Sequence, residues 1–122
     1  MSSRGKILVI DDDLHAAMPM VHYLTAEGFE VQHADNGGRG VQAAQRSKPD
    51  LVLCDMLMPG MSGMETLKMI KAELPQTVII VLSGIQGEEM TKAALSAGAH
   101  SYITKPINLE ELKRNVIEQV FK

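Results

Sequence analysis

The sequence has 122 residues, 45% of them hydrophobic and 22% charged, which fits one globular domain and excludes a disordered tail or a collagen-like fibre. A net charge of -3 argues against a protein whose main task is binding nucleic acid, and no apolar run approaches the roughly 20 residues of a membrane span. The single cysteine, Cys54, cannot form an internal disulfide, and the first apolar stretch is too short for a secretory signal, so we expect a cytoplasmic protein.

Short apolar runs alternate along the chain with segments of helical spacing. Three runs are almost purely apolar, as in parallel strands that are buried on both faces: 6–10, 51–54 and 78–82. Two further strands are predicted at 29–33, where apolar and polar residues alternate, and at 101–104.

A helix is predicted after each of these strands. The expected ranges are 14–26, 40–45, 64–74, 88–97 and 109–121. Residues 36–38 are expected to form a turn before the second helix, and Asn108 can cap the last one. Five strands and five helices in strict alternation predict an α/β fold with a doubly wound, five-stranded parallel sheet and right-handed crossovers.

Polar residues stand directly after four of the predicted strands. Asp11 and Asp12 follow the first strand and Asp55 follows the third, while Ser83 and Lys105 follow the fourth and fifth. In an open parallel sheet, ligands bind beyond the carboxyl ends of the strands. We therefore expect these side chains to gather at one edge of the sheet.

The chemistry of these residue types is coherent. Crowded carboxylates repel one another, and a divalent cation relieves that repulsion. Oxygen ligands favour Mg²⁺, which often also binds a phosphate, and a carboxylate beside Mg²⁺ can accept a phosphoryl group. An ammonium group and a hydroxyl group are suited to stabilise the charge on the transferring group. The pattern predicts Mg²⁺-dependent phosphoryl transfer to a carboxylate.

Four segments, in this order and at this spacing, resemble the receiver domain of two-component response regulators. They are ILVIDD at 7–12, LVLCDMLMPGMSG at 51–63, VLSG at 81–84 and GAHSYITKP at 98–106. The resemblance extends from residue 6 to residue 121 and implies a single receiver domain over residues 1–122. It also implies a (βα)5 flavodoxin-like, CheY-like fold with the strand order 2-1-3-4-5.

The resemblance assigns the acidic residues. It implies that Asp55 is the phosphoryl acceptor and also a Mg²⁺ ligand. Asp11 and Asp12 would be the acidic pair that holds Mg²⁺, with Asp12 the direct ligand and Asp11 acting through water. The backbone carbonyl of Leu57 would be a further ligand, which leaves the Leu57 side chain free to vary.

It also assigns the residues that contact the phosphoryl group. Ser83 would donate a hydrogen bond to a phosphoryl oxygen, Gly84 would leave room beside it, and Lys105 would pair with the group. Tyr102 would be an aromatic switch that turns inward once Ser83 moves toward the phosphate. Pro106 would have a structural role, with a cis bond to Lys105.

Some residues depart from the family's pattern or fall outside it. We interpret Asp13, which extends the acidic pair, as the cap of the first helix. Leu57 and Ile85 would flank the path of the hydrolysing water without a group to bind it, and we hypothesise a long-lived phosphoryl state. The histidines show no metal-ligand pattern and are interpreted as surface or boundary residues: His15, His22, His33 and His100.

The function implied by the resemblance is a signalling switch. It would accept a phosphoryl group from a sensor histidine kinase or a phosphotransfer protein and change the face at 88–122, which binds a downstream effector. It would catalyse only its own phosphorylation and dephosphorylation, so it would not be an enzyme with turnover. No direct nucleic-acid or membrane binding is expected, and a phosphorylation-dependent homodimer is compatible with the family.

Two alternatives remain open at this point. The first is a degenerate receiver that acts as a constitutive protein-interaction module, which the intact set of Asp12, Asp55, Ser83 and Lys105 argues against. The second is a small Mg²⁺-dependent phosphohydrolase that forms an aspartyl phosphate, which the short loops argue against. Phosphoryl uptake and turnover of a free substrate separate the three functions.

Overall fold

The computed structural model describes residues 4–84, 88–116, 118 and 120–121. Five strands form one parallel sheet: β1 (Lys6–Ile10), β2 (Glu30–Ala34), β3 (Leu51–Asp55), β4 (Val78–Ser83) and β5 (Ser101–Thr104). Their order is β2-β1-β3-β4-β5, so the predicted topology is confirmed. The order reverses beside β1, which places a crevice between the ends of β1 and β3.

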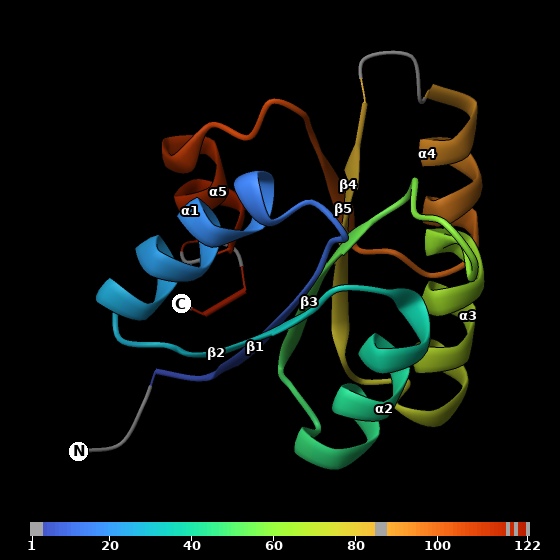
Figure 1. Ribbon diagram of the computed structural model, residues 1–122, viewed down its shortest axis with the longest axis horizontal. Helices are drawn as coiled ribbons and strands as arrows, with labels where there is room; N and C mark the ends of the chain where they lie inside the picture. The colour runs from blue at the N-terminus through green and yellow to red at the C-terminus, as the bar shows by residue number, and fades with distance from the viewer. Residues whose placement is uncertain (1–3, 85–87, 117, 119, 122) are drawn as a thin grey trace.

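Five helices cover the two faces of the sheet: α1 (Leu14–Ala26), α2 (Gly37–Ser47), α3 (Gly63–Glu73), α4 (Glu88–Ser96) and α5 (Leu109–Val116). Helices α1 and α5 lie on one face, and α2, α3 and α4 lie on the other (Figure 1). Among the described residues, no helix combines the length and the apolar character that crossing a membrane requires.

Two hydrophobic clusters, one on each face, explain why the central strands are apolar throughout. Ile7 and Val9 of β1 pack under α1 and α5, whereas Leu8 and Ile10 pack under α2, α3 and α4. Cys54 is fully buried in the second cluster, so it is a core residue on the face opposite the first cluster. Burial raises the pKa of its thiol to about 12 and keeps it protonated at neutral pH.

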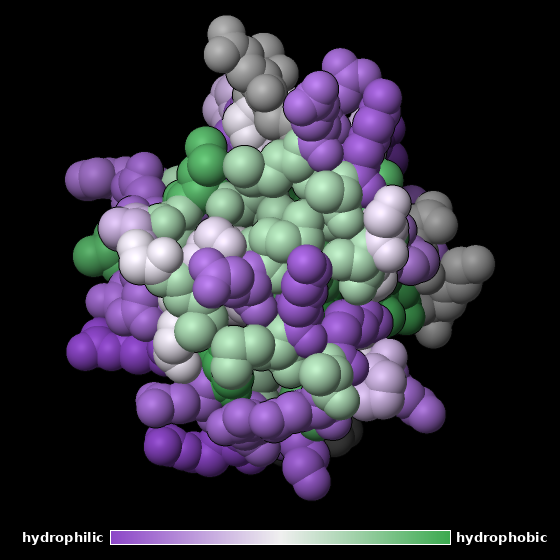
Figure 2. Space-filling model, turned by 90° about the vertical axis from the view of Figure 1, so that its right-hand side faces the viewer, coloured by the Kyte–Doolittle hydropathy of each residue, from purple (hydrophilic) through white to green (hydrophobic). Residues whose placement is uncertain are grey.

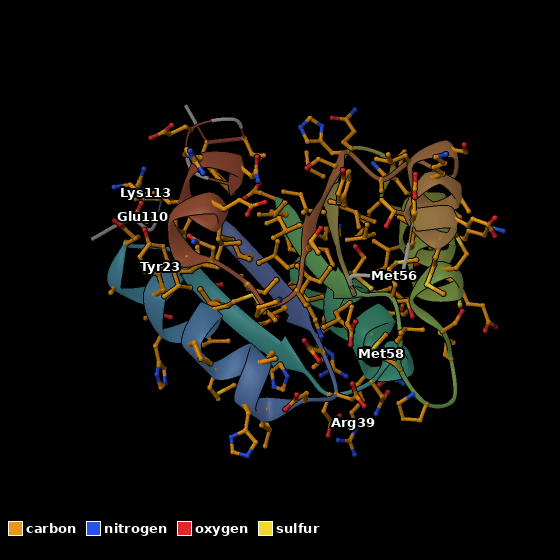
Figure 3. The ribbon with its side chains drawn as sticks, turned by 90° about the horizontal axis from the view of Figure 1, so that it is seen from above. Tyr23, Arg39, Met56, Met58, Glu110 and Lys113 are labelled. Atoms are coloured by element: carbon orange, nitrogen blue, oxygen red, sulfur yellow. The ribbon has the colours of Figure 1, made fainter. Side chains whose placement is uncertain are left out.

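Helices α1 and α5 lie side by side along the first cluster. Figure 3 shows Tyr23 of α1 beside Glu110 and Lys113 of α5. The predicted last helix, 109–121, is longer than α5, which ends at Val116; residues 117, 119 and 122 lie outside the described residues. Phe121 still contacts the core, with its ring centroid 4.8 Å from that of Phe29.

The predicted turn at 36–38 and the short helix at 40–45 are wrong in extent, because α2 already begins at Gly37. The Asn36 side chain accepts a hydrogen bond from the Arg39 N–H at 2.8 Å and caps the helix. Gly37 and Gly40 are not helix breakers here. A side chain at Gly37 would collide with Thr66, and one at Gly40 would collide with Ile10, so close packing requires glycine.

Candidate functional site

The strand register brings the polar residues that follow the strands to one edge of the sheet. Ile10 lies opposite Cys54 in the β1–β3 pair, so Asp11 and Asp55 lie next to each other beyond it. In the β4–β5 pair, Ser83 lies opposite Thr104, and the Lys105 N–H donates to the Ser83 carbonyl at 2.7 Å. The topology therefore brings side chains from four strand ends together.

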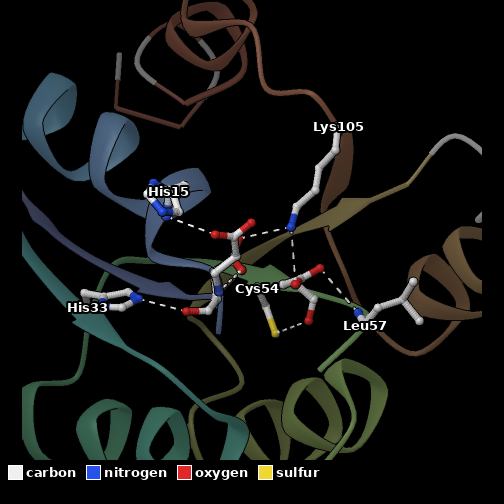
Figure 4. Close-up of polar contacts among 8 residues, drawn as sticks. His15, His33, Cys54, Leu57 and Lys105 are labelled. Carbon is white, nitrogen blue, oxygen red and sulfur yellow. Dashed lines mark hydrogen bonds and ion pairs between the residues drawn. The ribbon is translucent and has the colours of Figure 1, made fainter. Parts of the chain in front are cut away.

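Lys105 bridges the two buried carboxylates. Its Nζ lies 3.1 Å from Asp11 Oδ2 and 3.3 Å from Asp55 Oδ2 (Figure 4). Asp11 is fully buried and Asp55 is 5% exposed. Burial and the charge of Asp11 raise the pKa of Asp55 even though Lys105 opposes the shift. Burial alone would lower the pKa of Lys105, but the two carboxylates outweigh it and raise that pKa.

A third carboxylate completes an acidic cluster. Asp12 is exposed, and one carboxylate oxygen from each of Asp11, Asp12 and Asp55 lies within 4.8 Å of the others. Three carboxylates with one ammonium group leave the site with excess negative charge, and their hard oxygen donors match the preference of Mg²⁺. The residues present therefore fit a magnesium ion.

The loops beside the cluster position its members. The Asp13 side chain accepts from the His15 N–H at 2.9 Å, which confirms Asp13 as the cap of α1. The Leu57 N–H donates to Asp55 Oδ1 at 3.3 Å, and the Leu57 side chain is 66% exposed. Leu57 as a carbonyl ligand stays a prediction. Ile85, the other residue of the long-lifetime hypothesis, lies outside the described residues.

Ser83 and Gly84 lie next to the acidic cluster, and a hollow connects them to Tyr102. Ser83 is buried at the end of β4, and a methyl group at Gly84 would meet no described atom within 4 Å. Tyr102 is 48% exposed on β5 and shares with Ser83 a hollow of ≈ 430 Å³ beside α4. The Lys105–Pro106 peptide bond is cis, as predicted.

A groove of ≈ 1140 Å³ opens from Ser83 and Lys105 toward α3 and α4. Methionines from three segments line it: Met56, Met64 and Met90. Figure 2 shows the molecule from the side of α3 and α4, with hydrophobic residues in the middle of the face. Figure 3 shows Met56 and Met58 on this same side of the sheet. Met58 and Met64 pack against the second core cluster, where flexible methionine side chains fill irregular gaps.

One contact of the site was missed from the sequence. The interpretation of His33 as a surface or boundary residue is incomplete, because His33 is half-buried and its Nε2 lies 2.8 Å from the Asp11 backbone oxygen. The position of His33 in the sequence carried a signal. It is the last residue of the predicted strand 29–33, which neighbours the first strand in the order 2-1-3-4-5, so the order alone brings it near the end of the first strand. The register, which the sequence does not give, decides that its side chain reaches Asp11.

Gly63, the first residue of α3, sets how closely this helix approaches Asp55. A Cβ there would collide with the Asp55 carbonyl oxygen and with the Met56 backbone. We expect Gly63→Ala to lower the free energy of unfolding by about 2–3 kcal/mol, because the backbone that carries Asp55 has to move. Urea unfolding measures this. Gly38→Ala is the matched control: its nearest described contact is at 3.5 Å, and stability falling as much would contradict the steric explanation.

Comparisons with known proteins agree with this geometry. The family model described as the response regulator receiver domain matches residues 7–117. The chain is 36% identical over 110 residues to a cyclic di-GMP phosphodiesterase of Thermotoga maritima, covering 90% of this chain and 29% of that protein. It is 34% identical over 106 residues to the probable transcriptional regulatory protein TcrX of Mycobacterium tuberculosis, covering 87% of this chain and 45% of that protein.

Solved structures share the fold over nearly the whole chain. The chemotaxis protein CheY4 of Vibrio cholerae superposes with a TM-score of 0.87 at 28% identity, covering 94% of this chain and 97% of that one. A response regulator receiver domain protein from Clostridium thermocellum gives 0.88 at 31% identity, covering 94% and 93%. The chain spans less than half the length of the curated relatives it matches.

Proposed function

The chain belongs to the response regulator receiver domain family, and from this premise we propose that residues 1–122 form a single receiver domain whose Asp55 is phosphorylated in a two-component system. The observation that carries the proposal is the shared pairing of Lys105 with Asp55 and Asp11 at the carboxyl edge of the sheet. This pairing supports a site in which Asp55 is the nucleophile, Lys105 the fixed ammonium group, and Asp11 and Asp12 the acidic pair.

In the proposed reaction, an oxygen of Asp55 attacks the phosphorus atom of a phosphohistidine. A P–O bond to Asp55 forms, the P–N bond breaks, and the leaving imidazole keeps the bonding electrons and takes up a proton. The Leu57 N–H, which donates to Asp55 Oδ1, orients the carboxylate. Lys105 already touches Asp55, and in our proposal its ammonium group neutralises charge on the phosphoryl oxygens.

Asp11, Asp12, Asp55 and the Leu57 carbonyl would hold Mg²⁺. When bound, the ion would neutralise negative charge on the phosphoryl oxygens. The proposal is supported by the closeness of the three carboxylates, which repel one another until a cation relieves the repulsion. Burial first, and then the charge of Asp11, raise the pKa of Asp55. The exposed Asp12 is the direct ligand in this proposal, and the buried Asp11 acts through water.

We propose that phosphorylation changes the face at 88–122. Ser83 would donate to a phosphoryl oxygen, with the open space at Gly84 accommodating the group, and Tyr102 would turn into the hollow that it shares with Ser83. The hollow and the exposure of Tyr102 support this coupling. A sensor histidine kinase or phosphotransfer protein would be the donor, and an effector would read the changed face. Residues 117, 119 and 122 of this face lie outside the described residues.

The proposed domain catalyses only its own phosphorylation and dephosphorylation, without turnover of a free substrate. The phosphodiesterase and transcriptional activities named for the relatives belong to longer proteins, of which the match covers 29% and 45%. A cytoplasmic location is part of the proposal, because the single buried thiol of Cys54 fits a reducing compartment.

Beryllofluoride, which mimics a phosphoryl group on a carboxylate, tests the proposal at equilibrium. With Mg²⁺ and beryllofluoride, we expect shifts of the backbone amide signals of Leu57, Gly84 and Lys105 in NMR spectra, together with changes around Tyr102. Asp55→Asn should give none of these shifts. Binding that persists in this variant would contradict the assigned acceptor, and silence in the wild type would favour the degenerate interaction module.

A further inference from the structure

A side chain from the neighbouring strand binds the peptide carbonyl of Asp11. The last backbone hydrogen bond between β1 and β2 is donated by the Asp11 N–H to the Ala34 carbonyl at 3.1 Å. β2 ends at Ala34, and within the described ranges no backbone N–H donates to the Asp11 carbonyl. His33 Nε2 fills this place at 2.8 Å (Figure 4).

The contact fixes the role of each atom. A carbonyl oxygen can only accept, so Nε2 of His33 carries the proton and donates. Asp11 is fully buried, and its carbonyl would otherwise be an acceptor cut off from water, which costs free energy. The bond therefore replaces the ladder bond that β2 can no longer supply.

Asp11 is held at three oxygens. Its Oδ1 accepts from the Asp13 N–H at 3.0 Å, its Oδ2 from Lys105 Nζ at 3.1 Å, and its backbone oxygen from His33 Nε2 at 2.8 Å. The bond from His33 fixes the plane of the peptide that joins Asp11 to Asp12.

Asp12 depends on this peptide more than its neighbours do. In the part of the chain that the structure describes, no hydrogen bond or ion pair holds the exposed Asp12 carboxylate. The direction of that carboxylate is therefore set by the backbone of Asp12. The peptide that precedes Asp12 contains the Asp11 carbonyl oxygen, to which His33 donates.

We propose that His33 is a positioning residue for the divalent-cation site, acting through the Asp11–Asp12 peptide. This inference rests on the proposed function of the acidic cluster as a Mg²⁺ site. Residues that hydrogen-bond to metal ligands and hold them in place typically lower the metal affinity 10- to 100-fold when they are removed. His33 does not contact the Asp12 carboxylate itself; it contacts the peptide that precedes Asp12. We therefore expect an effect at the low end of this range, with Mg²⁺ binding about 10-fold weaker when the hydrogen bond from His33 is lost.

The test is titration of the full chain with Mg²⁺ alone, followed through the backbone amide signals of Asp12 and Asp13. His33→Leu removes the donor and should weaken Mg²⁺ binding about 10-fold. His33→Gln offers an amide N–H that reaches the same oxygen and should recover most of the affinity. If the leucine variant does not fold, His33→Asn replaces it, because the shorter asparagine side chain does not reach the Asp11 carbonyl oxygen. Equal Mg²⁺ affinities of the Asn and Gln variants would overturn the proposal.

Thr77→Val is the matched control. The Thr77 hydroxyl donates to the buried Pro49 carbonyl at 3.0 Å, at the opposite edge of the sheet. This variant should lose stability without losing Mg²⁺ affinity, and an equal loss of affinity would show a merely structural effect and overturn the proposal. Wild type that binds Mg²⁺ no better than His33→Leu overturns the positioning role alone. Wild type that binds no Mg²⁺ overturns both this inference and the proposed metal site.

Discussion

Lys105→Met is expected to lower the free energy of unfolding by about 2 kcal/mol at neutral pH without Mg²⁺. Removing one partner of a buried ion pair leaves the other charge uncompensated, which typically costs 3–5 kcal/mol. We expect less here because a quarter of the Lys105 side chain reaches solvent. Asp11 and Asp55 would then repel each other without a shared cation, so Mg²⁺ should stabilise this variant more than it stabilises the wild type.

The same substitution should slow phosphoryl uptake from acetyl phosphate about 100-fold, because a fixed cation at the transferring group is lost. Urea unfolding and the time course of phosphorylation measure the two effects. Lys92→Met is the matched control: Lys92 pairs with the exposed Glu88 at 3.7 Å, so its loss should change stability by less than about 0.5 kcal/mol and leave the uptake rate unchanged. Equal rates in wild type and Lys105→Met would remove Lys105 from the site.

Asp55→Asn is expected to make the fold more stable at neutral pH in the absence of Mg²⁺. Burial and the charge of Asp11 raise the pKa of Asp55 above its ordinary value of 3.8, so the folded protein holds this proton more tightly than the unfolded chain does. Stability then falls as the pH rises from 3.8 through the raised pKa, so the penalty grows toward neutral pH. Asparagine carries no charge and removes this penalty.

The difference in stability between Asp55→Asn and the wild type should therefore depend on pH. The stability gain of Asp55→Asn should grow as the pH rises from 3.8 toward neutral pH, and it should vanish below 3.8, where the wild-type carboxyl group is protonated in both the folded and the unfolded state. Mg²⁺ should stabilise the wild type and narrow the difference between the two proteins. A variant that is less stable than the wild type at neutral pH would show that the pairing with Lys105 outweighs the crowding.

Much of this architecture could be predicted because local patterns and topology agree. Runs such as 51–54 are apolar at every position, as expected for a strand that is buried between two layers of helices. The residue after each run then lies at the carboxyl edge of the sheet. Asp11, Asp55, Ser83 and Lys105 could therefore be grouped from the order of residues along the chain. The fold brings them together, with Lys105 contacting both carboxylates.

Other features depend on packing that no local pattern contains. Gly37 looks like a turn residue in sequence, yet it lies in the first turn of α2, because Asn36 caps the helix. The residue is glycine because Thr66 leaves no room for a side chain there. The contact between His33 and Asp11 joins residues 22 positions apart and arises from the place where β2 ends. It follows from strand order and register together, and neither is visible at His33 alone.

Intact mass after incubation with acetyl phosphate, with and without Mg²⁺, is the most direct test of Asp55 as the phosphoryl acceptor. The site predicts one added phosphoryl group in the wild type, dependent on Mg²⁺ and absent in Asp55→Asn. An adduct that persists in Asp55→Asn, or that forms equally well without Mg²⁺, would contradict the assigned acceptor or the metal site. No adduct in the wild type, together with no binding of beryllofluoride, would contradict the switch itself.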